Sequence, residues 1–188
     1  MPSNAHTIQV PPIPGMAATS STSAAAASAD AGFISATTHR IRLVPHLDSP
    51  KAFRFEAIGI NLKEGGPALR IERLRFSLFK WNQPVPAMKA LDNNKLGFGS
   101  KVVSRAHAEI WVEAGGRFFI RDTKSSGGTY LNGVRMSPAK TESTIFEVKD
   151  GNILQLGVDY CGGVEDVYKA VKMSIVIGRN ADAIRVKL

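Results

Sequence analysis

The chain has very little cysteine, since Cys161 is the single one among 188 residues. One cysteine cannot close a disulfide within the chain, and it cannot build a cysteine-rich zinc site. A chain with no disulfide framework is typical of a reducing compartment, so we expect a cytoplasmic and/or nuclear protein. The four histidines, at positions 6, 39, 46 and 107, have no metal-ligand spacing relative to Cys161. We therefore expect no metal site.

Several other signals are missing as well. No apolar run approaches the roughly 18 residues of a membrane-spanning helix, so we expect no membrane partner. No Lys or Arg precedes Arg40, whereas a secretory signal or an Arg-rich presequence would carry earlier ones. The sequence has no phosphate-binding Gly-x-x-x-x-Gly-Lys loop and no internal repeat. We expect no cofactor.

What the chain does have is an ordinary globular composition with an excess of positive charge. Hydrophobic residues make up 44% of the sequence and charged residues 21%, which suffices for one packed domain. The formal net charge is +8, which favours an acidic partner such as a phosphopeptide, a nucleic acid or an anionic membrane surface. Charge alone does not choose among them.

Composition divides the chain into three parts. Residues 1–36 begin with prolines and continue as an Ala/Ser/Thr tract without an amphipathic stripe, which predicts a disordered tail. Residues 37–180 alternate polar and apolar residues between turn signals, which predicts one strand-rich domain. Residues 181–188 are expected to be a short C-terminal tail.

The alternating segments predict an all-β sandwich or barrel of about 10–11 mostly antiparallel strands. Hairpin turns are expected at Gly115-Gly116, at Asn132-Gly133 and at residues 149–151. Residues 74–95 are interrupted by prolines and predict a long connection without a regular element. The last strand should be central or complete an edge. The expected strands cover residues 39–44, 52–58 (with Phe53 and Phe55 facing the core), 69–73, 96–98, 108–113, 118–122, 129–131, 145–148, 152–156 and 168–177.

Short polar side chains gather in the stretch of residues 102–133. Ser104 and Arg105 supply hydroxyl and guanidinium donors, which suit a bound anion. Ser104, His107 and Asp122 could also suggest a catalytic triad. The Ser and His are only three positions apart and no nucleophile elbow surrounds the Ser, so we expect no enzymatic activity from them.

Four blocks follow one another in this part of the chain: Ser104-Arg105-Ala106-His107, DTKSSGGT at residues 122–129, Asn132-Gly133, and DGNILQLG at residues 150–157. In this order they resemble the forkhead-associated (FHA) domain, over about residues 38–180. The amino-acid sequence of residues 101–122 and 154–160 is similar to the FHA part of fungal FHA–RING ubiquitin ligases of the Dma type. No cysteine-rich RING is present in this sequence.

The resemblance implies an FHA-type β-sandwich that binds a phosphothreonine-containing protein or peptide and is not an enzyme. It also implies a role for individual residues. The phosphopeptide-binding residues would be Arg73, Ser104, Arg105, Ser125, Ser126 and Gly127, and the site would be supported structurally by His107, Gly128, Thr129 and Asn132.

The sequence departs from the family pattern at two positions. Glu72 stands where the family has Gly, and its charge beside Arg73 is expected to weaken phosphate binding. Gly127 stands where the family often has Asn or Ser, and it lacks a side chain that could hydrogen-bond a peptide.

Other interpretations stay open. The chain could be a truncated or RING-less relative of an FHA–RING ubiquitin ligase, or a degenerate FHA scaffold that binds an unphosphorylated partner. Nucleic-acid binding is the least favoured, and it would show a steep salt dependence and no need for phosphothreonine. The sequence preference around the phosphothreonine and the oligomeric state are not predicted.

Overall fold

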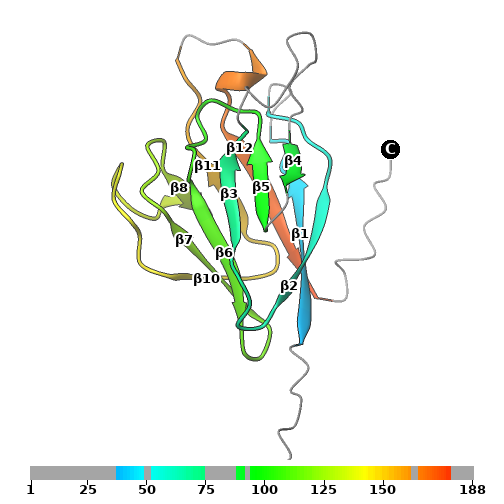
Figure 1. Cartoon of the computed structure of the whole chain (residues 1–188). Helices are drawn as coiled ribbons and strands as arrows, with labels where there is room; N and C mark the ends of the chain where they lie inside the picture. Colours follow the sequence, from blue (N-terminus) through cyan, green and yellow to red (C-terminus); the bar gives the residue numbers. More distant parts are fainter. Residues whose placement is uncertain (1–36, 49–51, 75–87, 92–93, 162–164, 179–188) are drawn as a thin grey trace, which may run out of the picture. The chain divides into compact units, whose positions relative to one another are not determined.

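The computed structural model describes residues 37–48, 52–74, 88–91, 94–161 and 165–178 (Figure 1). All of them lie in the compact unit Ser35–Leu188. The predicted tails, residues 1–36 and 181–188, lie outside the described residues. Within the described residues there are twelve strands, β1 to β12, and a single turn of 3₁₀ helix, η2 (Asp166–Tyr168), with no α-helix. No helix in these ranges is long and apolar enough to cross a membrane.

The first sheet has six strands in the order β2-β1-β12-β11-β8-β9, and all its neighbours are antiparallel. β12 is an interior strand between β1 and β11, as expected for the last strand-like segment. The strands of this sheet are β1 (Thr38–Pro45), β2 (Ile58–Lys63), β8 (Thr129–Leu131), β9 (Val134–Arg135), β11 (Ile153–Leu156) and β12 (Val171–Ile177).

The second sheet has six strands in the order β10-β7-β6-β3-β5-β4. Its strands are β3 (Leu69–Arg73), β4 (Met88–Leu91), β5 (Lys95–Phe98), β6 (Ala108–Glu113), β7 (Arg117–Asp122) and β10 (Phe146–Val148). β3 and β5 are parallel, and the other neighbours in this sheet are antiparallel. Because β3 and β5 run the same way, Arg73 at the end of β3 lies beside the end of β5 and the loop that follows it.

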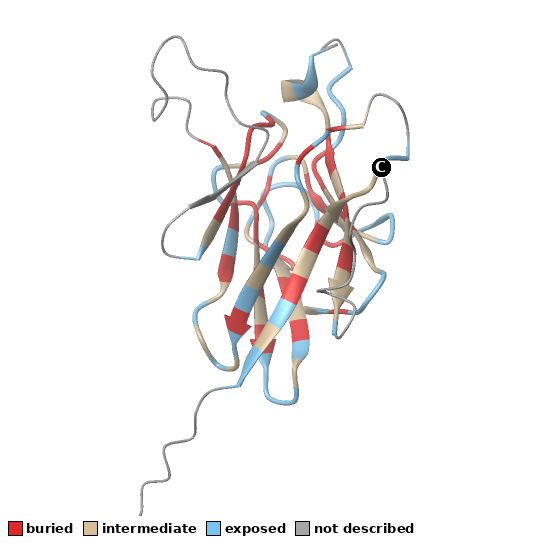
Figure 2. Cartoon of the chain, turned by 90° about the vertical axis from the view of Figure 1, so that its right-hand side faces the viewer, coloured by how far each residue is buried: buried red, intermediate tan, exposed pale blue. Residues whose placement is uncertain are grey.

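The two sheets face each other across one hydrophobic core (Figure 2). Alternate residues of β1, β6 and β12 are buried, as the pattern predicts for a sandwich. Ile41 and Met173 from the first sheet and Ile110 and Ile120 from the second are all fully buried in this core. Each such side chain contributes about 1.5–3 kcal/mol relative to exposure, so the core gives the loops at its end a rigid base.

The expected all-β sandwich is confirmed, and so are two of the three hairpins. Gly115 and Gly116 join β6 to β7 with φ of 82° and 73°. Asn132 and Gly133 join β8 to β9 with φ of 51° and 80°. Asn132 and Gly133 are the two central residues of a two-residue turn, for which positive φ at both is the required geometry, whereas Gly115 and Gly116 belong to the three-residue loop 114–116.

Three local predictions were wrong. Phe53 and Phe55 are buried, but residues 53–57 form no strand, and the strand begins at Ile58. Phe55 instead packs edge-on against Phe98 at 5.4 Å, so its burial comes from filling the core and not from strand pairing. The segment predicted as a plain connection contains β4, paired with β5; residues 75–87 lie outside the described residues. Residues 149–151 join β10 and β11, which belong to opposite sheets, so they form a turn and not a hairpin.

Candidate functional site

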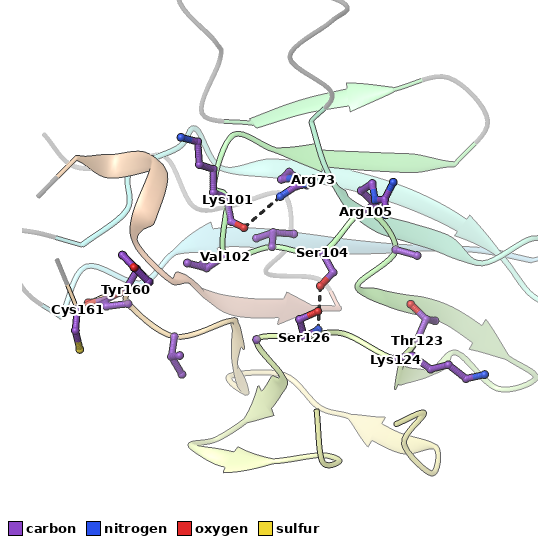
Figure 3. Close-up of a pocket in the computed structure, with 15 residues that line it drawn as sticks. Arg73, Lys101, Val102, Ser104, Arg105, Thr123, Lys124, Ser126, Tyr160 and Cys161 are labelled. Carbon is purple, nitrogen blue, oxygen red and sulfur yellow. Dashed lines mark hydrogen bonds between the residues drawn. The ribbon is translucent and has the colours of Figure 1, made fainter. Parts of the chain in front are cut away.

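An open groove with a volume of about 1000 Å³ lies at one end of the sandwich (Figure 3). It is lined by Arg73 at the end of β3 and by residues from the loops after β5, β7 and β11. These loops supply residues 101–106, residues 123, 124, 126 and 127, and residues 158–161. Most of the groove is therefore made of loop residues held at the end of the rigid sheets, an arrangement typical of binding sites on β-sandwiches.

Positive charge predominates on the groove wall. Among the described residues that line it are four cations, Arg73, Lys101, Arg105 and Lys124, and one carboxylate, Asp159. Asp159 Oδ1 accepts a hydrogen bond from the backbone N–H of Ala170 at 2.7 Å, so this carboxylate also supports the loop. The groove as a whole favours an anionic ligand.

Arg73 and Ser104 are joined through the backbone. The N–H of Arg73 donates to the carbonyl of Ser104 at 2.9 Å, and Arg73 Nη1 lies 3.4 Å from the carbonyl oxygen of Lys101. Ser104 Oγ accepts from the N–H of Ser126 at 3.0 Å (Figure 3). This bond uses an acceptor lone pair of the hydroxyl, which leaves its proton free to be donated to a ligand. Arg73 and Ser104 thus present donors to one groove.

His107 is fully buried and connects two loops of the groove. Its Nδ1 accepts from the N–H of Ser104 at 2.9 Å, and its Nε2 lies 3.2 Å from the carbonyl oxygen of Gly128. A ring that accepts at Nδ1 must carry its proton on Nε2, so the imidazole is neutral and donates to Gly128. Burial lowers the pKa of His107, and the nearby Asp122 carboxylate and the Gly128 carbonyl oppose this shift.

These contacts do not fit the catalytic-triad alternative. The imidazole of His107 bonds the backbone N–H of Ser104 and makes no hydrogen bond to the hydroxyl. The carboxylate of Asp122 accepts hydrogen bonds from the hydroxyls of Ser125 and Thr129 instead. Neither His107 nor Asp122 is placed to take the proton of the Ser104 hydroxyl.

Asp122 is buried at the end of β7 and holds the loop of residues 123–128. Its Oδ1 accepts from the N–H of Ser125 at 2.7 Å. Its Oδ2 accepts from the hydroxyls of Ser125 and Thr129, both at 2.6 Å. Ser125 Oγ in turn accepts from the N–H of Gly128 at 2.9 Å. The oxygens of Asp122 and Ser125 are thus buried and hydrogen-bonded, which fixes the conformation of the loop.

The structure does not place Ser125, a predicted peptide contact, on the groove. Ser125 is buried beneath the loop, its hydroxyl is used on both sides, and it does not line the groove. The Asp-x-x-Ser spacing of Asp122 and Ser125 was the signal for this role, because it lets one carboxylate accept from the N–H and hydroxyl three residues later. Ser126, its neighbour, is exposed and does line the groove.

Gly127 lines the groove where two other loops approach it closely. A Cβ at this position would lie 2.9 Å from both the Cα of Gly157 and the carbonyl oxygen of Val102. Both neighbours are backbone atoms and cannot simply rotate away. The departure from the family's Asn or Ser therefore has a steric cause in this chain.

Glu72 lies on the other side of β3 from Arg73. Successive residues of a strand point to opposite faces, and Glu72 lines a second, smaller pocket of about 150 Å³ with Arg70 and Lys95. Ala106 and Thr123 line both this pocket and the groove. It is not among the residues that line the main groove. The expected weakening of phosphate binding by Glu72 stays a prediction.

The other predicted support residues differ in their distance from the groove. Gly128 has φ of 85° and is buried beside the guanidinium of Arg135, and Thr129 bonds Asp122. Asn132 lies at the far end of β8, where its Oδ1 accepts from the N–H of Ile153 at 2.8 Å. Asn132 thus supports the sheet and not the groove itself.

No role was predicted for Lys101, Lys124 or residues 158–161, all of which line the groove. Lys101 Nζ lies 3.1 Å from Tyr168 Oη, and the backbone N–H of Lys101 donates to the carbonyl of Val167 at 2.6 Å. This wall depends on contacts between distant segments, for which a local pattern carries no signal. Within the described part of the chain, no group of three potential metal ligands is present.

Comparison with known proteins gives a consistent result. Residues 90–157 match the family model described as "FHA domain". The chain is 37% identical over 150 residues to the E3 ubiquitin-protein ligase DMA2 of Saccharomyces cerevisiae, covering 74% of this chain and 27% of that protein. It is 42% identical over 89 residues to the probable E3 ubiquitin-protein ligase dma1 of Schizosaccharomyces pombe, covering 47% of this chain and 33% of that protein.

A solved structure of the N-terminal FHA domain of S. cerevisiae Rad53p, in complex with a phosphothreonine peptide, has a TM-score of 0.44 and 14% identity. The match covers 77% of this chain and 98% of that one. The chain spans about a quarter to a third of the length of the two ligases above.

Proposed function

The chain belongs to the FHA domain family over residues 90–157, and from this we propose that it is a non-enzymatic module that binds phosphothreonine-containing peptides. The observation that carries the proposal is the pairing of Arg73 and Ser104 on the wall of a cationic groove. We place the module in a reducing compartment, the cytoplasm and/or the nucleus, in agreement with its single cysteine.

The chemistry of a phosphothreonine suits this groove. Its phosphate carries about −1.5 to −2 charges and three strong acceptor oxygens. Arg73 offers a planar fork that can bond two of these oxygens, and Ser104 offers the proton of its hydroxyl. The guanidinium of Arg105, also on the groove wall, supplies a second positive charge beside the phosphate.

The peptide chain itself would lie along the loop that follows β7. Ser126 is exposed there and can hydrogen-bond the peptide backbone, and Gly127 leaves the groove floor open because it has no side chain. The buried bonds of Asp122 and His107 hold this loop before the ligand arrives. A loop held in this way loses little conformational freedom on binding, which favours affinity.

The direct test is titration of the chain with a phosphothreonine peptide library and with the same peptides unphosphorylated. We expect binding of the phosphorylated peptides in the micromolar range, about −8 kcal/mol. Arg73→Ala and Ser104→Ala should each weaken binding by about tenfold or more, because a hydrogen bond to a charged group contributes about 1.5–3 kcal/mol.

The chain offers matched controls for both variants. Arg70→Ala removes the same side chain from the opposite face of β3, where Arg70 lies 3.4 Å from Glu109, and should leave the affinity unchanged. Ser104→Thr keeps the hydroxyl and should retain most of the binding. Equal affinity for phosphorylated and unphosphorylated peptides would instead favour a degenerate scaffold, and this proposal would be wrong.

A second candidate function follows from the similarity to the DMA2 ligase. The chain would then be the recognition part of a ubiquitin-ligase system, with the catalytic part supplied by a RING domain that is absent from this sequence. A Cys/His-rich reading frame directly downstream in the genomic DNA would support this candidate. A downstream region without such a frame would count against it.

A further inference from the structure

The groove holds more positive charge than one phosphate group requires. A phosphate of at most two negative charges is matched by Arg73 and Arg105. Lys101 and Lys124 remain on the wall, against the single carboxylate of Asp159. Whether these two lysines are free for a ligand depends on their contacts within the fold.

The ammonium group of Lys101 already has a partner within the fold, Tyr168. Its ammonium group donates to the hydroxyl of Tyr168 at 3.1 Å and lies 4.6 Å from the centre of the same ring. The Lys124 ammonium, by contrast, forms no hydrogen bond or ion pair with any described residue, although it is exposed on the groove wall. The guanidinium of Arg105 likewise has no such partner, but it is already assigned to the phosphate. Lys124 is therefore the unpartnered cation that remains on the groove wall for a second anion, among the described residues.

The backbone of Lys124 supplies a second, independent observation. Its φ is 69°, in the left-handed region that side chains with a Cβ disfavour. The buried bonds on either side impose this conformation, since the N–H of Thr123 donates to the carbonyl of His107 at 2.9 Å and the N–H of Ser125 donates to Asp122. Strained backbone of this kind concentrates at ligand-binding sites. A lysine is thus held in an unfavourable conformation at the edge of a binding groove.

Lys124 lies toward one end of the groove. Figure 3 shows Lys124 and Arg105 at one end, while Tyr160 and Cys161 lie at the other, with Arg73 and Ser104 between them. A peptide held by its phosphothreonine at Arg73 would pass Lys124 on one side of the phosphothreonine only.

We propose that Lys124 is a specificity-determining residue that binds a second anionic side chain of the peptide, on one side of the phosphothreonine. The ligand class is then a peptide with a phosphothreonine and a nearby phosphate or carboxylate. This inference rests on the proposed function of the groove, and it adds the charge pattern of the ligand.

The test uses the whole chain and a series of synthetic peptides. The reference peptide has one phosphothreonine and uncharged neighbours. The other peptides carry phosphoserine, glutamate or glutamine at one position, up to four residues before or after the phosphothreonine. We expect an anionic residue to tighten binding by about fivefold at positions on one side, with glutamine giving no gain. The phosphoserine and glutamate peptides distinguish the two sources of negative charge.

Lys124→Gln should reduce this gain to less than about twofold, because it removes the charge and keeps most of the side chain. The matched control is Lys140→Gln. Lys140 is also an exposed lysine with positive φ, 60°, but it does not line the groove, so its variant should keep the gain. Comparing the ratio of the two affinities within each variant cancels any effect on folding.

Three results would overturn the inference: no position that gives a gain, equal gains on both sides, or a gain that survives Lys124→Gln. The experiment tells failure of this inference apart from failure of the proposed function. If the reference peptide binds only when phosphorylated but no gain is found, the phosphothreonine site stands and the second subsite is wrong. If the reference peptide does not bind at all, the proposed function itself is wrong.

Discussion

His107 shows how one buried side chain can make stability depend on pH. Its neutral ring accepts from Ser104 and donates to Gly128, so adding a proton would break the bond to Ser104. The pKa of His107 is lowered in the folded protein, mainly by burial, whereas an unfolded chain has a His pKa of about 6.5. The folded and unfolded states therefore bind different numbers of protons below that value.

The sign of the effect follows from this difference. Above about pH 6.5 both states are neutral at His107 and stability is complete. As the pH falls below 6.5, the unfolded state takes up a proton first and stability decreases, by at most about 1.4 kcal/mol per pH unit, until the folded pKa is reached. NMR titration of the His107 ring measures its pKa in the folded protein directly. A midpoint at or above 6.5 would contradict the prediction.

Asp122, Ser125 and Thr129 show what short spacing leaves open. Thr129 was expected to support the loop and Ser125 to contact a peptide, whereas in the fold both hydroxyls bond the buried carboxylate of Asp122. Glu72 and Arg73 are adjacent in sequence, yet only Arg73 lines the groove. Alternation along β3 sends neighbouring side chains to opposite faces.

At the scale of elements, the groove depends on the close approach of three loops. Gly127, Gly157 and Val102 meet with backbone atoms in near contact, since a Cβ on Gly157 would lie 2.8 Å from the carbonyl oxygen of Val102. The three loops follow β7, β11 and β5, which belong to both sheets. The shape of the groove therefore depends on how closely loops from the two sheets can approach.

Gly127→Ala should separate these loops. The added methyl group would lie 2.9 Å from backbone atoms of Gly157 and Val102, so we expect a loss of about 1–3 kcal/mol in the free energy of unfolding. Binding of a phosphothreonine peptide should weaken in parallel. Thermal unfolding and peptide titration measure the two effects.

Ser126→Ala is the control for this variant, because Ser126 is exposed in the same loop and keeps its N–H bond to Ser104. Its stability should stay within about 0.5 kcal/mol of the wild type. An unchanged melting temperature for Gly127→Ala would show that the loops can move apart without loss.

Strands were predictable where alternation and pairing coincide, as in β6, β7 and β12. Strands were not predictable where residues alternate without strand pairing. Phe53 and Phe55 alternate because both fill the core, yet their backbone has no ladder partner. Pairing with a distant strand, and membership of one sheet or the other, leave no mark in a short window of sequence, which is why β4 and the turn at residues 149–151 were misassigned.

At the scale of the whole molecule, the fold extends well beyond residues 90–157, the part that matches the family model. β1, β2, β3 and β12 all lie outside this range. The core residues Ile41, Leu43, Met173 and Ile175, each fully buried, come from β1 and β12. Arg73 also lies outside it, so neither the core nor the groove is complete within the matched residues.

A fragment of residues 90–157 should therefore not fold, whereas a fragment of residues 37–178 should. Without β12, β11 loses its neighbour on one side, and without β1 and β12 the first sheet cannot cover the core. Dispersed amide signals in an NMR spectrum and a cooperative unfolding transition are expected for the longer fragment only. Cooperative unfolding of residues 90–157 would contradict this view of the core.

The pairing of β1 with β12 also has a consequence for biosynthesis. Ile41 lies opposite Ile177, so the strand made near the start of the domain finds its partner near the end. While the ribosome adds the residues between them, β1 can pair only with β2 and keeps its other edge exposed. Exposed strand edges on nascent chains are open to wrong pairings, and contacts this distant form slowly. Protection of that edge until translation has passed Ile177 would determine how much of the newly made protein reaches its native state.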